Sequence, residues 1–241
     1  MGVAGRGLTT RMYAMTIVGG RGERLRPYTD NIPKAMVAIN GRPLLAYQVD
    51  WMRANGVTDV IFLCGHLSEK IEKFVADGSD LGIRAHYSHE ETPLGRGGAV
   101  RKGFALVPTD EERVLVVNGD VLTDQPLDPL IALHQEKSAT ATMMLIPYPS
   151  QYGVVRFSSD GLVSSFDEKP DLPHWINAGV YIFDRSMERI LPEIGDHETE
   201  TFPTLAREKQ LAALTSSAFW TSVESAKELR EVGERFATLA Q

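Results

Sequence analysis

The sequence predicts an α/β fold built on a mostly parallel, doubly wound sheet with helices on both faces. Strand-like and helix-like segments alternate through the first half of the 241-residue chain, which is the rhythm of parallel sheets. The segment Arg113–Val117 is a continuous apolar run, as expected of a strand buried on both faces. Short strands separated by turn residues follow in the second half, and they predict antiparallel hairpins laid over or appended to the main sheet.

The elements of the first half are apolar or periodic runs that stop at glycine, asparagine or proline. Glycine ends two of the predicted strands, Asn55-Gly56 ends the first helix, and Ser68 is the expected N-cap of the second. The predicted strands are Met12–Val18, Val57–Cys64, Ile83–Ser88 and Arg113–Val117. The predicted helices are Leu44–Ala54, Glu69–Ala76, Gly97–Leu106 and Pro129–Lys137.

The second half is expected to hold short strands, two short helices and a terminal helix. The strands are Thr140–Ile146, Val154–Phe157, Leu162–Phe166, Val180–Phe183, Leu211–Leu214 and Ala218–Trp220; the helices are Ser186–Leu191, Phe202–Glu208 and Val223–Ala240. We expect a loose leader over residues 1–14 and one domain over 15–241, with halves at 15–138 and 139–241. In such a Rossmann-like arrangement the cleft lies along the carboxyl ends of the parallel strands.

Composition and charge exclude several classes of protein. Apolar residues make up 43% and charged residues 24% of the chain, which is ordinary globular composition. The net charge of −7 argues against a nucleic-acid partner bound by bulk charge. No apolar run reaches about 18 residues, so no membrane partner is expected. Cys64 is the one cysteine, which favours a reducing, cytoplasmic compartment.

A glycine-rich stretch follows the first predicted strand. Gly19, Gly20 and Gly22 let the backbone approach a ligand and turn its N–H groups toward phosphate oxygens. The dinucleotide pattern G-x-G-x-x-G fails at Leu25, and no Gly-Lys-Ser/Thr triplet is present. Alone, the stretch fits a plain strand-to-helix turn as well as a phosphate loop. Nearby cations favour the phosphate loop: Arg21, Arg24, Arg26 and Lys34.

The run GGRGERLRPYTDNIPKAMVAINGRPLL resembles the signature of the sugar-1-phosphate nucleotidyltransferases (NDP-sugar pyrophosphorylases). That signature is G-G-x-G-T-R-L-x-P-x-T, then P-K-x-[LM], then G-x-P-[LI]. This sequence departs from it at Glu23, where Thr is usual, and at Val18, where Ala is usual. The resemblance runs from about Met15 to Phe183 and continues more weakly to the end. It is greatest to short guanylyltransferases for mannose-like or heptose-like 1-phosphates.

The resemblance implies roles for the residues of the first half. The loop of Gly19, Gly20 and Gly22 would cradle a nucleoside triphosphate, Arg24 would lie on the departing pyrophosphate, and Lys34 would bridge phosphates in the transition state. Glu23 should then point away or pair with an arginine. In the family, a glycine-rich helix start contacts the nucleobase, and Arg96 replaces its usual Thr here. The matching residues in this chain are Glu91, Leu94, Gly95 and Gly98.

Asn118, Gly119 and Asp120 directly follow the apolar strand Arg113–Val117. A carboxylate at the carboxyl end of a central strand faces the crevice of a doubly wound sheet, and carboxylate with phosphate oxygens suits Mg²⁺. An ordinary turn after a strand explains the same residues structurally. The family's N-G-D implies that Asp120 is catalytic and binds magnesium, with Asn118 and Gly119 beside the nucleotide.

The sugar 1-phosphate site is expected in the second half. The family's Y-G-V, E-K-P and N-A-G segments match Tyr152-Gly153, Glu168-Lys169 and Asn177 to Gly179. Glutamate can accept hydrogen bonds from sugar hydroxyls, and lysine can hold a phosphate. Without the resemblance, the Glu-Lys-Pro segment is simply a solvated turn.

Near the end of the chain, the family usually carries an aspartate that is a second magnesium ligand. Ser222 occupies that position, and Glu224 stands where glycine is usual. Either Glu224 reaches the metal, or Asp120, phosphates and water hold it alone. We favour the second arrangement, because a helix N-terminus is a sufficient reason for a glutamate there.

The resemblance as a whole implies transfer of a nucleotidyl group from a nucleoside triphosphate, with GTP favoured, to a sugar 1-phosphate. An enzyme for another phosphorylated small molecule, using CTP or UTP on the same fold, is the first alternative. A catalytically silent binding or regulatory subunit is the second, and the intact Arg24, Lys34 and Asp120 argue against it. Association of the chain with further copies of itself is left open.

Overall fold

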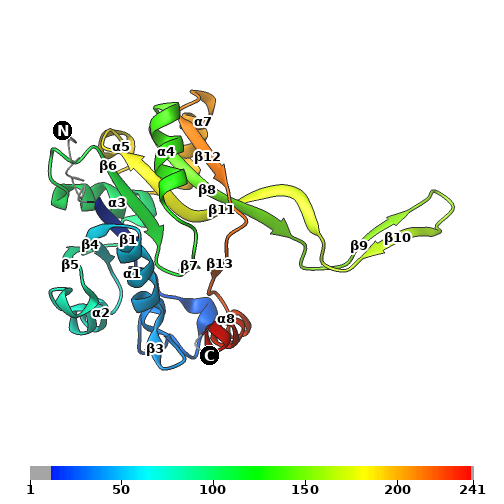
Figure 1. The fold of residues 1–241 in the computed structure, drawn as a ribbon, viewed down its shortest axis with the longest axis horizontal. Helices are drawn as coiled ribbons and strands as arrows, with labels where there is room; N and C mark the ends of the chain where they lie inside the picture. Colours follow the sequence, from blue (N-terminus) through cyan, green and yellow to red (C-terminus); the bar gives the residue numbers. More distant parts are fainter. Residues whose placement is uncertain (1–11, 240–241) are drawn as a thin grey trace, which may run out of the picture.

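A seven-stranded sheet forms the centre of the computed structural model, which describes residues 12–239 (Figure 1). Its strand order is β12-β8-β11-β6-β1-β4-β5, and only β11 runs antiparallel to its neighbours. The strands are β1 (Met12–Ile17), β4 (Val57–Cys64), β5 (Arg84–His89), β6 (Arg113–Asn118), β8 (Ala141–Pro149), β11 (Asp171–Asp184) and β12 (Leu211–Thr215). The predicted mostly parallel sheet is therefore confirmed.

Helices cover both faces of the sheet, as predicted. Apolar side chains of β1, β4 and β6 alternate between two clusters of buried residues, one under each helical layer. One face carries α1 (Leu44–Ala54), α2 (Ser68–Val75) and α4 (Asp128–Lys137). The other carries α3 (Gly95–Gly103), α5 (Met187–Ile190), α6 (His197–Glu200) and α7 (Phe202–Arg207).

A third, smaller cluster joins the start of the described chain to its end. The terminal helix α8 (Ala226–Leu239) packs Val232 against Leu25 and Leu44. Ser225 and Glu228 form a capping box at its start, because the Ser225 N–H donates to Glu228 Oε2 at 2.8 Å. Short 3₁₀ turns and two-residue strands surround this cluster: Glu23–Leu25, Lys34–Met36, β2 (Ala38–Ile39) and β3 (Arg42–Pro43).

Three expectations for the elements were wrong. The predicted antiparallel hairpin appended to the sheet is present, at Val154–Phe157 and Val163–Asp167, but the segments β8 and β11 belong to the main sheet itself. Helix α2 begins at Ser68 itself, with Leu67 before it and no side-chain cap. Strand β1 begins at Met12, inside the expected leader of residues 1–14; the rest of that leader lies outside the described residues.

Two smaller ribbons complete the fold. Strand β7 (Val121–Thr123) pairs with β13 (Trp220–Ser222) beside the cleft described below. Strands β9 (Val154–Phe157) and β10 (Val163–Asp167) form an antiparallel hairpin that projects from the body, and we call residues 150–170 the arm (Figure 1). None of the described helices is long and apolar enough to cross a membrane.

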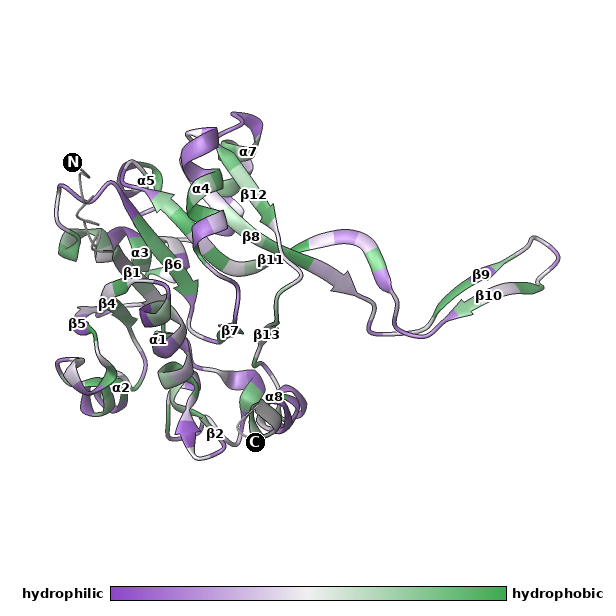
Figure 2. Cartoon of the chain, viewed as in Figure 1, coloured by the Kyte–Doolittle hydropathy of each residue, from purple (hydrophilic) through white to green (hydrophobic). Residues whose placement is uncertain are grey.

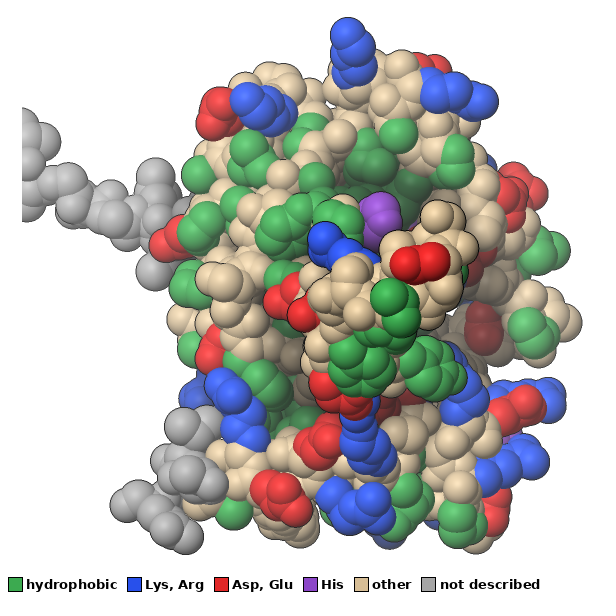
Figure 3. Space-filling model, turned by 90° about the vertical axis from the view of Figure 1, so that its right-hand side faces the viewer, with side chains coloured by type: hydrophobic (Ala, Val, Ile, Leu, Met, Phe, Trp, Pro, Cys, Tyr) green, Lys and Arg blue, Asp and Glu red, His purple; other side chains and the backbone are tan. Residues whose placement is uncertain are grey.

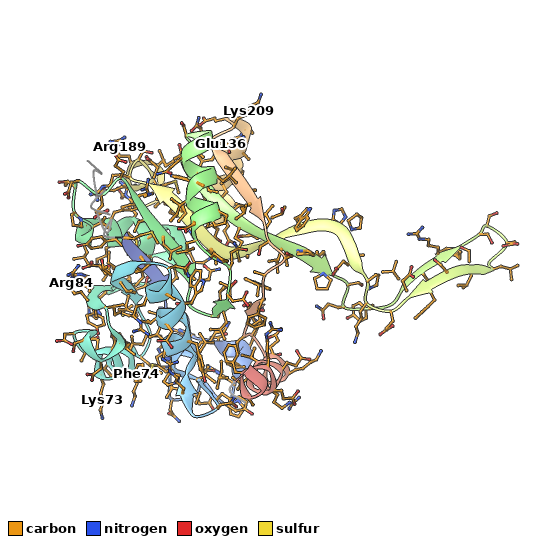
Figure 4. The ribbon with its side chains drawn as sticks, viewed as in Figure 1. Lys73, Phe74, Arg84, Glu136, Arg189 and Lys209 are labelled. Carbon is orange, nitrogen blue, oxygen red and sulfur yellow. The ribbon has the colours of Figure 1, made fainter. Side chains whose placement is uncertain are left out.

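At the outer edge of the sheet, a buried carboxylate joins β4 to β5. Asp59 is almost wholly buried, and its carboxylate accepts a hydrogen bond from Arg84 Nε at 2.7 Å. Burial raises the pKa of Asp59, but hydrogen bonds from Arg84, Thr58 and His86 outweigh it and leave that pKa below its usual range. Arg84 lies at the edge of the molecule far from the arm (Figure 4).

Candidate active site

A cleft of about 1820 Å³ opens at the carboxyl ends of the parallel strands β1, β4 and β6. That is the edge of the sheet at which the sequence predicts a ligand site. The cleft brings together predicted residues from both halves of the chain. They are Gly19, Gly20, Gly22, Arg24, Lys34, Glu91, Gly95, Asn118, Gly119, Asp120, Asn177 and Gly179.

Lys34 and Asp120 form an ion pair inside the cleft, and both side chains are largely buried. Asp120 follows β6, and Lys34 begins a short 3₁₀ turn after Pro33. Gly22 packs against this lysine: it has a φ of +62°, and an added Cβ would lie 3.0 Å from Lys34 Cβ. A residue with a side chain at position 22 would therefore be strained and would crowd Lys34.

Arg24 is held by Glu224 across the cleft. Its Nη2 donates to Glu224 Oε1 at 2.8 Å, and Nη1 pairs with the other carboxylate oxygen. Glu224 is thus bound to an arginine rather than placed as a partner of Asp120. Glu23 is exposed beside the cleft and forms no ion pair with any residue of the described range 12–239, so the expected pairing with an arginine is absent there.

Gln48 is a buried residue of α1 that our sequence reasoning missed. Its Nε2 donates to the carbonyl oxygens of Asn118 at 2.9 Å and Val121 at 3.0 Å. Its Oε1 accepts from the Thr16 hydroxyl at 2.6 Å, which ties it to β1. One buried amide therefore fixes the turn that carries Asp120. A single glutamine in a helix matches no motif, so nothing in the sequence pointed to it.

The second half contributes a hydrogen-bond network around Glu198, which the sequence reasoning also missed. Asn177 Nδ2 donates to Tyr181 Oη at 2.7 Å and to Glu198 Oε1 at 3.1 Å. The Asn177 Oδ1 accepts from the Gly179 N–H at 3.0 Å. The Asn177 side chain is therefore occupied by protein groups and shapes the backbone at Gly179. Burial and the nearby Glu198 raise the pKa of Tyr181 well above its usual value.

Arg96, on α3, forms an ion pair with Glu198. The guanidinium lies 2.8 Å from Glu198 Oε2, and its Nε donates to Asp196 Oδ2 at 2.7 Å. Arg96, Asn177 and Glu198 all line the cleft. This network joins α3 of the first half to β11 and α6 of the second half. Arg96, which stands where the family usually has threonine, thus connects the two halves of the chain.

Leu94 and Gly98 do not line the cleft, although both were predicted to contact the nucleotide. The N–H groups at the start of α3 face a protein loop: Gly97 N–H donates to the Gly195 carbonyl oxygen at 2.9 Å. An added Cβ on Gly98 would lie 2.4 Å from the Glu193 carbonyl oxygen. Close packing of this loop is a sufficient reason for glycine at position 98.

Four predicted sugar-site residues lie on the arm and outside the lining of the cleft: Tyr152, Gly153, Glu168 and Lys169. The Tyr152 side chain is largely exposed, and Lys169 Nζ lies 3.9 Å from Glu168 Oε1 in solvent-facing positions. The root of the arm does reach the cleft, through Pro149, Gln151 and Asp171. The structure therefore separates the two groups of predicted sugar-site residues, since Asn177 and Gly179 line the cleft.

Ser222 lies next to the N-G-D turn, because it pairs with Val121 in the β13–β7 ribbon. The Val223 N–H donates to the Asp120 carbonyl oxygen at 3.0 Å. Asp120 is the one carboxylate at this corner that the resemblance assigns to a metal. The donor set fits Mg²⁺, which is commonly held by one or two carboxylates together with substrate phosphates and water.

The nucleotidyl transferase family profile matches residues 13–238. Among curated proteins, the chain is 37% identical to the mannose-1-phosphate guanylyltransferase catalytic subunit beta of Danio rerio, over 90% of this chain and 62% of that protein. It is 33% identical to the mannose-1-phosphate guanyltransferase of Gibberella zeae, with the same coverage of both chains. The chain thus spans about 62% of the length of the curated relatives it matches.

Solved structures agree on the fold. HddC from Yersinia pseudotuberculosis superposes with a TM-score of 0.74 at 22% identity, covering 93% of this chain and 99% of that one; one of its structures is a complex with GMP-PN. A putative glucose-1-phosphate thymidylyltransferase from Bacillus anthracis gives a TM-score of 0.72 at 18% identity, covering 92% of this chain and 94% of that one. The sequence signature, the cleft at the strand ends and the profile match over nearly the whole chain lead to one conclusion. The chain belongs to the nucleotidyl transferase family.

Proposed function

We propose that the protein transfers a guanylyl group from GTP to a sugar 1-phosphate of the mannose type, releasing pyrophosphate. The observation that carries the proposal is the meeting of Arg24, Lys34 and Asp120 with the glycine loop in one cleft at the carboxyl ends of the strands. GTP and a mannose-like sugar are supported by the relatives, which are named mannose-1-phosphate guanylyltransferases.

The chemistry needs no general base, because the attacking group is already an anionic phosphate oxygen. Catalysis then consists of positioning the two phosphates in line and neutralising charge at the reacting phosphorus. Lys34 supplies a positive charge from a largely buried position. Arg24 supplies a second one at the mouth of the glycine loop, where pyrophosphate would leave.

Both cations are paired with protein carboxylates, Lys34 with Asp120 and Arg24 with Glu224. These partners orient each cation before the substrate arrives, which lowers the ordering cost of binding. Triphosphate binding would exchange the carboxylates for phosphate oxygens. Gln48 acts as a positioning residue, because it fixes the turn that carries Asp120.

We propose Mg²⁺ as the metal, held by Asp120 together with substrate phosphates and water. When bound, the ion would neutralise developing charge on the phosphates. Ser222 is a neutral hydroxyl and a weak magnesium ligand beside a carboxylate. Glu224 is bound to Arg24, which supports magnesium binding by a single protein carboxylate.

The experiment is a matrix of nucleoside triphosphates against sugar 1-phosphates, read by pyrophosphate release with and without Mg²⁺. We expect the highest kcat/KM for GTP with mannose 1-phosphate or a close relative. Pyrophosphate release with CTP or UTP but not with GTP would overturn the guanylyl assignment, while nucleotidyl transfer would remain the reaction. No release across the matrix, with GTP binding intact by calorimetry, would instead support a binding or regulatory subunit.

A further inference from the structure

The arm is the part of the molecule that its own fold leaves uncovered. It stands away from the body in Figure 1, and none of the three clusters of buried residues includes a residue of the arm. A hairpin of two strands is at best marginally stable alone in water. Some other surface is therefore needed to hold the arm in one conformation.

The two faces of the hairpin differ sharply. Cross-strand pairs place Phe157 opposite Val163 and Val155 opposite Phe166, so these four side chains share one face. The other face carries the pairs Arg156 with Ser165 and Val154 with Asp167. The arm is thus amphipathic, with an apolar face and a polar face. Figure 2 shows hydrophobic residues along both strands of the arm.

The apolar face is open to solvent. The exposed fractions are 72% for Phe157, 63% for Phe166, 62% for Val163 and 44% for Val155. Figure 3 looks at the molecule from the side on which the arm projects, and hydrophobic side chains gather at the front of that view. An exposed apolar group of this kind marks an interaction surface rather than ordinary surface.

We propose that the apolar face of the arm is a dimerisation surface that packs against the same face of a second copy of this chain. The face consists of Val155, Phe157, Val163 and Phe166. It carries no charged side chain, so two copies can meet face to face without burying an ion.

The area of the face supports this choice of partner. Its exposed apolar surface is about 400 Å², judged from two largely exposed phenylalanines and two valines. Two such faces in contact bury about 800 Å² in total, which is the size of a weak, reversible interface. A partner that lacked an apolar face of its own would bury much less apolar surface against the arm.

The shape of the molecule sets the arrangement. The arm projects from one side of the body, so two arms laid antiparallel about a two-fold axis keep the two bodies at opposite ends (Figure 1). Each tip then lies beside the other arm's root.

Sedimentation velocity on the whole protein tests the proposal. We expect a dimer for the wild type, and a dissociation constant at least about ten-fold higher for Phe157→Asp. The matched control is Ser165→Asp, which adds one carboxylate to the polar face of the same hairpin and should leave the dissociation constant unchanged. A monomeric wild type at about 100 µM, or a Phe157→Asp dimer as tight as the wild type, would overturn the proposal.

Disulfide cross-linking covers the case in which Phe157→Asp simply disorders the hairpin. The chain's one cysteine, Cys64, is buried, and burial raises its pKa to about 12, so its thiol stays unreactive. Val155→Cys on the apolar face should form a disulfide-linked dimer under mild oxidation. Arg156→Cys on the polar face should not. Equal yields from the two variants would contradict face-to-face packing.

Discussion

Lys34 is the residue on which the proposed chemistry depends most. Replacing it with alanine removes a preorganised positive charge from a site where negative charge develops. We expect Lys34→Ala to lower kcat by on the order of 10²–10³. Steady-state pyrophosphate release measures this, and circular dichroism checks the fold. Lys137→Ala, which removes an exposed lysine paired with Glu136 on α4, is the control and should keep wild-type turnover. Wild-type turnover in Lys34→Ala would remove this lysine from the mechanism.

The missing second carboxylate at position 222 gives a prediction for the metal. Ser222→Asp adds a carboxylate beside the N-G-D turn, so it should tighten Mg²⁺ binding in the absence of nucleotide. Glu224→Ala frees Arg24 from its ion pair but removes no metal ligand. It should therefore leave the magnesium concentration for half-maximal rate unchanged. Calorimetry measures the first effect and magnesium titration of turnover the second.

The outcome of the Glu224→Ala titration separates the two arrangements left open by the sequence. A several-fold rise in the magnesium requirement would mean that Glu224 leaves Arg24 and joins the metal when nucleotide binds. An unchanged requirement, with a lower KM for the nucleotide, would mean that Glu224 only competes with phosphates for Arg24.

The site residues that a motif revealed lie in a local sequence pattern, whereas those that only the structure revealed depend on contacts between distant residues. Arg24, Lys34 and Asp120 stand in a dense signature, so the sequence alone placed them at one site, and they meet in the cleft. Gln48 and Glu198 act through partners 70 and 21 residues away in the chain, respectively. Their roles depend on long-range contacts that no local spacing encodes.

At the scale of single elements, the root of the arm is where expectation and structure disagree. The resemblance predicts that Lys169 holds the sugar phosphate, whereas its side chain lies outside the cleft lining. We expect Lys169→Ala to raise the KM for the sugar 1-phosphate at least about ten-fold, with a smaller effect on the nucleotide, since a charge-assisted contact contributes about 1.5–3 kcal/mol. This result requires the arm root to move toward the cleft during binding.

The control for that prediction lies on the same ribbon. Arg156→Ala removes a cation from β9, beyond the root, and should leave both KM values unchanged. If Lys169→Ala also leaves both KM values unchanged, the lysine stays in solvent through the reaction. The phosphate-binding role that the resemblance implies for Lys169 is then wrong.

The elements that the sequence predicted best are those whose burial is decided locally. The bounds of β4 and α1 agree with the predicted Val57–Cys64 and Leu44–Ala54, because β4 is an apolar run closed by Gly65 and α1 is a periodic pattern closed by Asn55-Gly56. The first half of β11 was missed, since Asp171–Ile176 is largely polar or exposed and contains Pro173. Those residues form a strand because they pair with β8, so a tertiary contact rather than their own sequence pattern decides their structure.

At the scale of the whole molecule, a buried histidine makes stability depend on pH. His197 packs edge-on against Tyr181, Phe183 and Phe202, and burial lowers its pKa from 6.5 to about 4. The folded state binds this proton more weakly than the unfolded state. Stability is therefore complete above pH 6.5 and falls as the pH drops toward 4, by about 3 kcal/mol for this group.

Urea unfolding at a series of pH values between 7 and 4 measures this loss. His197→Phe keeps a ring in the aromatic cluster and removes the titrating group, so its free energy of unfolding should fall less over the same interval. His174→Asn, at an exposed position, should follow the wild-type curve. A wild-type curve that is flat down to pH 4 would contradict the assignment to His197.

The ion pair between Arg24 and Glu224 has a consequence for synthesis of the chain on the ribosome. Arg24 is synthesised 200 residues before Glu224, yet this arginine and the cluster around Leu25 and Leu44 need Val223, Glu224 and α8. The sheet can assemble while translation continues, but this corner stays open until α8 emerges. A nascent protein stalled before residue 224 would carry most of the fold and an unfinished triphosphate site.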